Sequence, residues 1–253
     1  MRKMMSLLYG TIAYAVFLCT FIYGIGFVGN LLVPKSIDSG TPGDFGMSLV
    51  INVSLLALFA LQHTIMARPG FKEVWTKVVP KQIERSTFVL FASLILILTF
   101  WQWRPMPGLI WQVENNAGQV LLIGLQMAGW VFALLATVMI HHFDLFGMRQ
   151  VYLYAKGEKY RDLGFRTPGL YKYVRHPIML GFLIAFWATP MMTVGHLVFA
   201  LTTTAYVLVG TRIEERDLLR LHDDRYLAYR RQVPALIPRP APARGQEAVD
   251  IGG

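Results

Sequence analysis

Residues 165–181 have the sequence FRTPGLYKYVRHPIMLG, a polar and cationic stretch between two long apolar blocks. Arg175, His176 and Pro177 open directly into the apolar run that begins at Ile178. Proline suits the first turn of a helix, where its missing N–H is no loss. A helix start also carries unpaired backbone donors and the positive end of a dipole. The stretch therefore predicts a cationic platform at a membrane surface that can hold an anionic group.

The apolar block that follows, residues 178–210, is too long for a single span. As one helix it would measure about 50 Å at 1.5 Å per residue, whereas the hydrocarbon core of a bilayer is about 30 Å thick. Pro190 and Gly195 stand near its middle. We therefore predict a helical hairpin that turns near residues 189–196, with His196 at the turn as an interfacial residue.

The far end of this block carries the sequence RIEE at residues 212–215. A hairpin returns the chain to the side of the membrane from which it started. The four residues should therefore lie beside Tyr171, Arg175 and His176 and complete one polar site with them.

Two adjacent glutamates, Glu214 and Glu215, point to different faces of a helix. One of them can be buried in a site while the other pairs with a base such as Arg212 or Arg216. A carboxylate can bind a ribose diol or an ammonium group, and an arginine can hold a carboxylate through two parallel hydrogen bonds. These groups suit a zwitterionic ligand that carries a sugar. The alternative is an ion-pair network that only fixes the ends of the hairpin.

The composition of the whole chain is that of a membrane protein. Of 253 residues, 55% are hydrophobic and 15% are charged, and the mean hydropathy is +0.45; soluble proteins carry about 25% charged residues. Four further apolar runs reach or approach the roughly 20 residues that a membrane span needs, at residues 7–33, 47–67, 88–103 and 119–140. Apolar residues recur at helical spacing in residues 212–239, which predicts a surface helix.

The expected fold is thus an all-α integral membrane protein. It has four spanning helices, a C-terminal helical hairpin and an amphipathic tail helix. We divide the chain into N-terminal membrane helices (1–118), a core with the hairpin and the site (119–240), and a disordered tail (241–253).

Lysine and arginine concentrate in the N-terminus and in residues 68–85, 144–177 and 212–239. The loops at residues 34–46 and 104–118 carry one each. Basic loops stay cytoplasmic, so both termini and the polar site should face the cytoplasm. The net charge of +9 reflects this orientation and gives no reason to expect nucleic acid as a partner.

Histidines at span ends are further candidates for a site. Residues 141–150, HHFDLFGMRQ, place His141, His142 and Asp144 at a spacing that does not set three metal ligands on one helix face, so no metal is expected. His63, near the end of the second run, is either an interfacial residue or part of the pocket. The single cysteine, Cys19, excludes a disulfide within the chain.

The sequences TPGLYKYVRHPIMLGF (167–182) and RIEERDLLRLHDDRYLAYRRQVPALIP (212–238) resemble the membrane methyltransferase superfamily that includes isoprenylcysteine carboxyl methyltransferases and phospholipid N-methyltransferases. The resemblance implies S-adenosylmethionine as cofactor, bound on the cytoplasmic side, and a lipophilic methyl acceptor. It also implies cofactor contacts at residues Tyr171, Arg175, His176, Glu214 and Glu215.

Residues 141–150 further resemble a bacterial subgroup of this superfamily that methylates a small volatile thiol, with relatives named for nitrite and nitric oxide reduction. The thiolate is the nucleophile in such a reaction, and catalysis consists mostly of alignment and proton removal. Arg175 or a histidine could stabilise the anion, and His142, His176 or Glu214 could accept its proton. We expect His142 to act as the base and Glu214 to anchor the cofactor. Open alternatives are a prenyl-cysteine carboxylate or lipid amine as acceptor, and a non-catalytic membrane partner of a nitrogen-oxide reduction system. No protein partner is implied.

Overall fold

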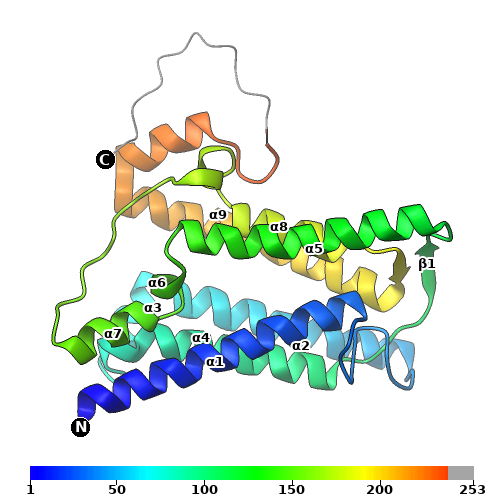
Figure 1. Cartoon of the computed structure of the whole chain (residues 1–253), viewed down its shortest axis with the longest axis horizontal. Coiled ribbons are helices and arrows are strands. Elements are labelled where there is room, and N and C mark those ends of the chain that lie inside the picture. The colour runs from blue at the N-terminus through cyan, green and yellow to red at the C-terminus, as the bar shows by residue number, and fades with distance from the viewer. Residues whose placement is uncertain (239–253) are drawn as a thin grey trace.

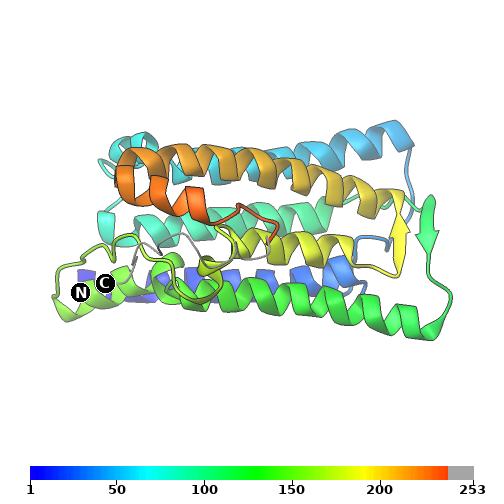
Figure 2. The same ribbon diagram turned by 90° about the horizontal axis from the view of Figure 1, so that it is seen from above.

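The computed structural model describes residues 1–238 and is built almost entirely of helices (Figures 1 and 2). The tail expected to be disordered, residues 241–253, lies outside this range. Within the described residues, five helices are long and apolar enough to cross a membrane. These are α1 (Arg2–Gly29), α2 (Phe45–Ala67), α4 (Lys81–Gln102), α5 (Asn116–Met139) and the apolar part of α9 (Val194–Gln232).

The first four of these helices correspond to the four spans that the sequence predicts. Side chains fix where two of them begin: Asp44 accepts a hydrogen bond from the backbone N–H of Met47, and Asn115 from that of Gly118, as N-cap residues do. α4 begins seven residues before the expected boundary at 88. Its first turns carry charged residues, which extend the helix beyond its apolar run.

Residues 178–210 do not form one helix. The short apolar helix α8 (Pro177–Trp187) ends well before α9 begins at Val194, so the chain reverses within the segment where the sequence places the turn. A small antiparallel sheet, which was not expected, occupies this reversal: β1 (Leu109–Gln112) pairs with β2 (Met191–Thr193). Strands of three and four residues are too short to give a readable alternating pattern.

Small residues bring α8 and α5 into backbone contact. A Cβ atom added to Gly129 would lie 2.6 Å from the backbone nitrogen of Ala185, and one added to Gly181 would lie 2.6 Å from that of Ala133. Such close approach between membrane helices depends on residues without bulky side chains. The contact places the start of α8, and with it Arg175 and His176, at the end of the bundle.

Residues 212–232, where the sequence predicts an amphipathic tail helix, are helical and continue α9 without a break to Gln232. No glycine or proline interrupts residues 211–232. The helix nevertheless bends back on itself: Arg230 Nε lies 3.6 Å from Glu215 Oε2, although a straight helix would separate these residues by about 22 Å. Figures 1 and 2 show its last turns, in orange, folded back over the end of the bundle.

The segments richest in lysine and arginine gather at one end of the molecule. Figure 1 shows the N-terminus, α3 (Pro69–Trp75), α6 (His142–Leu145), α7 (Met148–Lys156) and the bend of α9 at the end opposite the small sheet. The expected juxtaposition of the two polar ends of the hairpin is therefore present.

Candidate active site

Arg175 and Glu215 form a buried ion pair at the basic end of the bundle. Arg175 donates from Nε to Glu215 Oε1 at 2.8 Å, and its Nη2 atom lies 2.6 Å from the same oxygen. The two side chains are 9% and 11% exposed. The remaining nitrogen, Nη1, donates to the carbonyl oxygens of Arg230 and Val233. All three nitrogens of Arg175 are therefore engaged by the protein itself.

His176 joins both glutamates of the predicted site. Its Nε2 atom lies 3.1 Å from Glu215 Oε1, and its Nδ1 atom lies 3.6 Å from Glu214 Oε2. The second distance is too long for a hydrogen bond. Both oxygens of Glu215 face cations, whereas the side chain of Glu214 is 52% exposed. The two carboxylates thus differ in role: Glu215 holds the network together, and Glu214 is free to contact a ligand.

The segment that follows α9 completes this corner through its backbone. The N–H groups of Arg175 and His176 donate to the carbonyl oxygens of Pro234 and Ala235, at 2.9 and 3.0 Å. The residues just before α8 would otherwise leave buried polar groups without partners, which is costly. The end of the described chain is therefore an integral part of the site.

Three tyrosines enclose the corner. Tyr171, in the 3₁₀ turn η1 (Gly169–Lys172), lies within 3.4 Å of the Ala136 carbonyl through its hydroxyl and accepts a 2.6 Å hydrogen bond from Tyr229 at its carbonyl. Tyr226 and Tyr229 are almost fully buried and pack against Phe165. Burial raises the pKa of the hydroxyls of Tyr171, Tyr226 and Tyr229, so they remain neutral at physiological pH.

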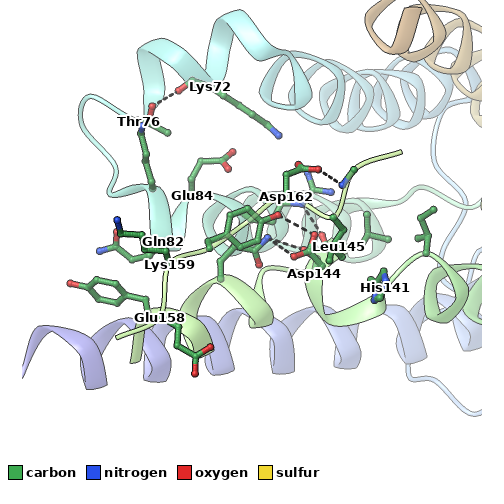
Figure 3. Close-up of a pocket in the computed structure, with 18 of the residues that line it drawn as sticks. Lys72, Thr76, Gln82, Glu84, His141, Asp144, Leu145, Glu158, Lys159 and Asp162 are labelled. Carbon is green, nitrogen blue, oxygen red and sulfur yellow. Dashed lines mark hydrogen bonds between the residues drawn. The ribbon is translucent and has the colours of Figure 1, made fainter. Parts of the chain in front are cut away.

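A cleft with a volume of about 1310 Å³ lies at the basic end of the molecule (Figure 3). It exceeds the roughly 300–1,000 Å³ typical of small-molecule sites. Its walls come from α3, α4, the segment 139–168 and Leu218 of α9, one helical turn beyond Glu214. None of the five predicted cofactor residues lines it: Tyr171, Arg175, His176, Glu214 and Glu215. Glu214 does not itself line the cleft, but it lies on the same side of α9 as Leu218, one helical turn away.

Charged groups of both signs line the cleft. Lys72 and Glu84 project from the side of α3 and α4, and Asp144 from α6 (Figure 3). Asp144 accepts hydrogen bonds from Arg149 and Tyr160, at 2.9 and 3.2 Å. Burial, and then the positive charge of Arg85, lowers the pKa of Lys72. Paired acids and bases of this kind suit a zwitterionic ligand.

His142, the expected base, lies among aromatic residues rather than in the ion-pair network. Its Nε2 atom is 2.8 Å from the hydroxyl of Tyr14, and its Nδ1 atom is 2.8 Å from that of Thr137. Since the Thr137 hydroxyl donates to the Leu134 carbonyl, it accepts from Nδ1, and Nε2 then accepts from Tyr14. Burial lowers the pKa of His142. In residues 1–238 it makes no hydrogen bond or ion pair with Arg175 or either glutamate.

The neighbouring His141 has a different environment. It is exposed, and its Nε2 atom lies 3.4 Å from Arg166. No group of three histidine, cysteine, aspartate or glutamate side chains in the described part of the chain is arranged to hold a metal ion.

Several contacts of the site were not predicted from the sequence. Glu215 pairs with Arg175 and Arg230 rather than with Arg212 or Arg216, since the bend of α9 brings Arg230 back. The end of α2 is tied to α9 by an ion pair of 2.7 Å between Arg68 and Asp217.

Arg68 also donates to the carbonyl of Ile213, next to Glu214. A basic residue in a loop and an acidic residue in a helix carry no signal of such a pairing in the sequence.

The five membrane-length helices and the charged corner define an integral membrane protein with a polar site at one end. The family model described as NnrU protein matches residues 52–229. A methanethiol S-methyltransferase of Mycobacterium tuberculosis is 52% identical over 240 residues, 95% of this chain and 98% of that protein.

Proteins of related name occur in two further bacteria. A methanethiol S-methyltransferase of Crocosphaera subtropica is 52% identical over 92% of this chain and 91% of its own length. Methanethiol S-methyltransferase 2 of Bradyrhizobium diazoefficiens is 53% identical over 94% of this chain and 91% of its own length. The chain belongs to the NnrU protein family, and these relatives identify it as a membrane methyltransferase, as the sequence analysis expected.

Proposed function

We propose that the protein transfers a methyl group from S-adenosylmethionine to the thiolate of methanethiol, which yields dimethyl sulfide. One observation carries this proposal: the 52% identity with the mycobacterial enzyme of that name extends over 95% of the chain. The aligned length therefore takes in the apolar helices as well as most of the polar corner.

The donor set of the corner fits S-adenosylmethionine, which carries an ammonium group, a carboxylate, a ribose and a methyl group on a positively charged sulfur. Glu214, half exposed and one helical turn from Leu218 in the wall of the cleft, would bind the ammonium group or the ribose hydroxyls. Glu215, Arg175 and His176 would hold this face of α9 in place. Tyr171 would close the corner from η1.

Binding and activation of methanethiol require an enclosed apolar pocket and a group that accepts the proton of the thiol. Methanethiol offers few atoms to bind, so the rate depends on how closely the reacting atoms are aligned. His142 is neutral at neutral pH because burial lowers its pKa, which suits a base. To accept a proton at Nε2 it would first have to release the hydroxyl of Tyr14.

We place the basic end of the bundle, and with it the site, at the cytoplasmic face of a bacterial inner membrane. The segments that gather at this end carry an excess of lysine and arginine, and such basic segments stay on the cytoplasmic side. The proposal involves the bilayer and a small lipophilic thiol as partners, and neither nucleic acid nor a second protein.

The test is to incubate the purified full chain with methyl-labelled S-adenosylmethionine and three acceptors: methanethiol, a prenyl-cysteine and a lipid amine. We expect labelled dimethyl sulfide in the headspace, and donor binding that is weakened in Glu214→Gln. Label found in the prenyl-cysteine ester or in the lipid amine, and not in dimethyl sulfide, would show that methanethiol is not the acceptor. Absence of donor binding would indicate a non-catalytic membrane partner and would refute the proposal.

A further inference from the structure

His63 is enclosed by aromatic rings one turn before the end of α2. Its ring centroid lies 4.8 Å from that of Phe88, 5.3 Å from Phe59 and 6.4 Å from Tyr206. Its Nδ1 atom is buried and has no hydrogen-bond partner among residues 1–238. An unsatisfied buried nitrogen costs about 1–3 kcal/mol, and such groups in native proteins usually have a specific reason.

Two histidines on other helices, His142 and His196, are held more tightly. Both ring nitrogens of His142 are engaged by Tyr14 and Thr137. His196, at the opposite end of α9, is bonded through Nε2 to the Phe186 carbonyl, although its Nδ1 atom is also without a partner in the described chain. His63, in contrast, forms no hydrogen bond to any residue whose side chain the structure describes.

His63 lies on the membrane side of the candidate site. The guanidinium of Arg85 is 5.2 Å from the centre of the Phe88 ring that His63 contacts, and Arg85 also lines the cleft. Tyr206 precedes Glu214 by two turns of α9, about 12 Å along the axis. A ligand held at Glu214 could thus extend along α9 toward the histidine.

We propose that His63 is the base that takes the proton from the thiol, with Arg85 beside it to stabilise the thiolate. This inference rests on the proposed function. The S–H bond breaks and its proton goes to Nδ1 of His63. The thiolate sulfur then forms a bond to the methyl carbon of a sulfonium donor, and the carbon–sulfur bond of the donor breaks with its electron pair left on the departing sulfur. The imidazolium afterwards returns its proton to water.

The surroundings of His63 suit both reactants. A small apolar thiol partitions into the bilayer and would approach from the apolar side, where Phe59, Phe88 and Tyr206 form the wall. The faces of the same rings attract a cation, which favours the sulfonium end of the donor. The charged and titratable groups around the imidazole are Arg85 on α4 and Tyr206 on α9.

The test compares His63→Asn with His142→Asn, the rival base, and with His196→Asn, a matched change of an internal histidine far from the site. General-base catalysis contributes at least about 100-fold, so we expect His63→Asn to lower kcat by that factor at neutral pH. The donor Kd should stay within about twofold of the wild-type value, because the base does not hold the donor. The rate should recover as the pH rises toward the pKa of the free thiol. His196→Asn should leave the pH profile unchanged.

A second measurement is independent of turnover. In the dead-end complex of the protein with S-adenosylhomocysteine and methanethiol, the ultraviolet absorbance of the thiolate should appear at a lower pH in wild type than in His63→Asn. A merely structural role for His63 would not produce this difference.

The outcomes are distinct. If His63→Asn and His63→Gln retain the wild-type rate, or lose it without recovery at high pH and without a change in thiolate absorbance, the inference is wrong while the proposed function stands. If His142→Asn alone shows the high-pH recovery, His142 is the base. If the wild-type protein methylates no thiol, the proposed function itself fails.

Discussion

The hydroxyl of Tyr229 donates a 2.6 Å hydrogen bond to the carbonyl oxygen of Tyr171. Tyr229 belongs to the returning end of α9 and Tyr171 to the turn before α8. Since the side chain of Tyr229 is almost fully buried, water does not compete for this bond. The folded-back end of α9 is thus fixed to the corner by a directional contact as well as by packing.

Replacement of Tyr229 by phenylalanine should loosen this corner. The ring can still pack against Phe165, but the loss of one hydrogen bond costs about 1 kcal/mol. We expect a lower Tm and several-fold weaker binding of S-adenosylmethionine by calorimetry. Tyr173→Phe, at a position that is 69% exposed, is the control. Wild-type affinity in Tyr229→Phe would mean that the returning helix does not shape the donor site.

The two adjacent glutamates should respond differently to the same substitution. Glu215→Gln leaves the buried guanidinium of Arg175 without its counter-ion, so we expect destabilisation by about 3 kcal/mol. Glu214→Gln should leave the thermal stability nearly unchanged, since the side chain is half exposed, and should weaken donor binding. Thermal unfolding and calorimetry on both variants separate the two effects. Equal losses of stability would contradict the division of roles.

Protonation of His142 should lower the stability of the folded protein as the pH falls. Burial lowers the pKa of this side chain below its usual 6.5, so the unfolded chain takes up the proton more readily than the folded one. The contribution of the neutral His142 to the free energy of unfolding is complete above about pH 6.5. It is lost as the pH falls through the lower pKa that His142 has in the folded protein.

The measurement is the Tm of wild type and His142→Asn between about pH 7.5 and 5. The difference between them should narrow as the pH falls. His141→Asn, at the exposed neighbouring histidine, serves as the control. A Tm difference that stays constant over this range would show that His142 is not the titrating group.

The contact between α5 and α8 should tolerate no side chain at Gly129. A Cβ there would meet the backbone of α8 at 2.6 Å, and overpacking of this kind costs about 1–3 kcal/mol. We expect Gly129→Val to lower the Tm and to weaken donor binding, because α8 carries His176 at its N-cap. Gly124→Val, on the same helix with open space around it, is the matched control. Identical behaviour of the two variants would exclude the packing explanation.

The hairpin and the meeting of its polar ends could be predicted because they follow from the length of the apolar block and from the charges of the residues at its two ends. A block of apolar residues longer than a bilayer must turn, and Pro190 and Gly195 mark where it can. The turn returns residues 212–215 to the side of Arg175. Neither step needs information about side-chain packing.

The bend of α9 could not be predicted in the same way. Residues 211–232 contain no helix breaker, and the fold-back depends on tertiary contacts of Tyr229 and Arg230 with residues far away in sequence. The pairing of Glu215 with Arg230 could not be predicted for this reason. His142 was expected in the site from its position at a span end, whereas its actual partners are Tyr14 on α1 and Thr137 on α5.

The backbone bonds from Arg175 and His176 to Pro234 and Ala235 set an order of events during biosynthesis. The ribosome makes α8 and most of α9 well before it reaches residues 234–235. The polar corner lacks two of its hydrogen-bond partners until residues 234–235 emerge from the exit tunnel. The site therefore matures only after both helices that carry its side chains have been made.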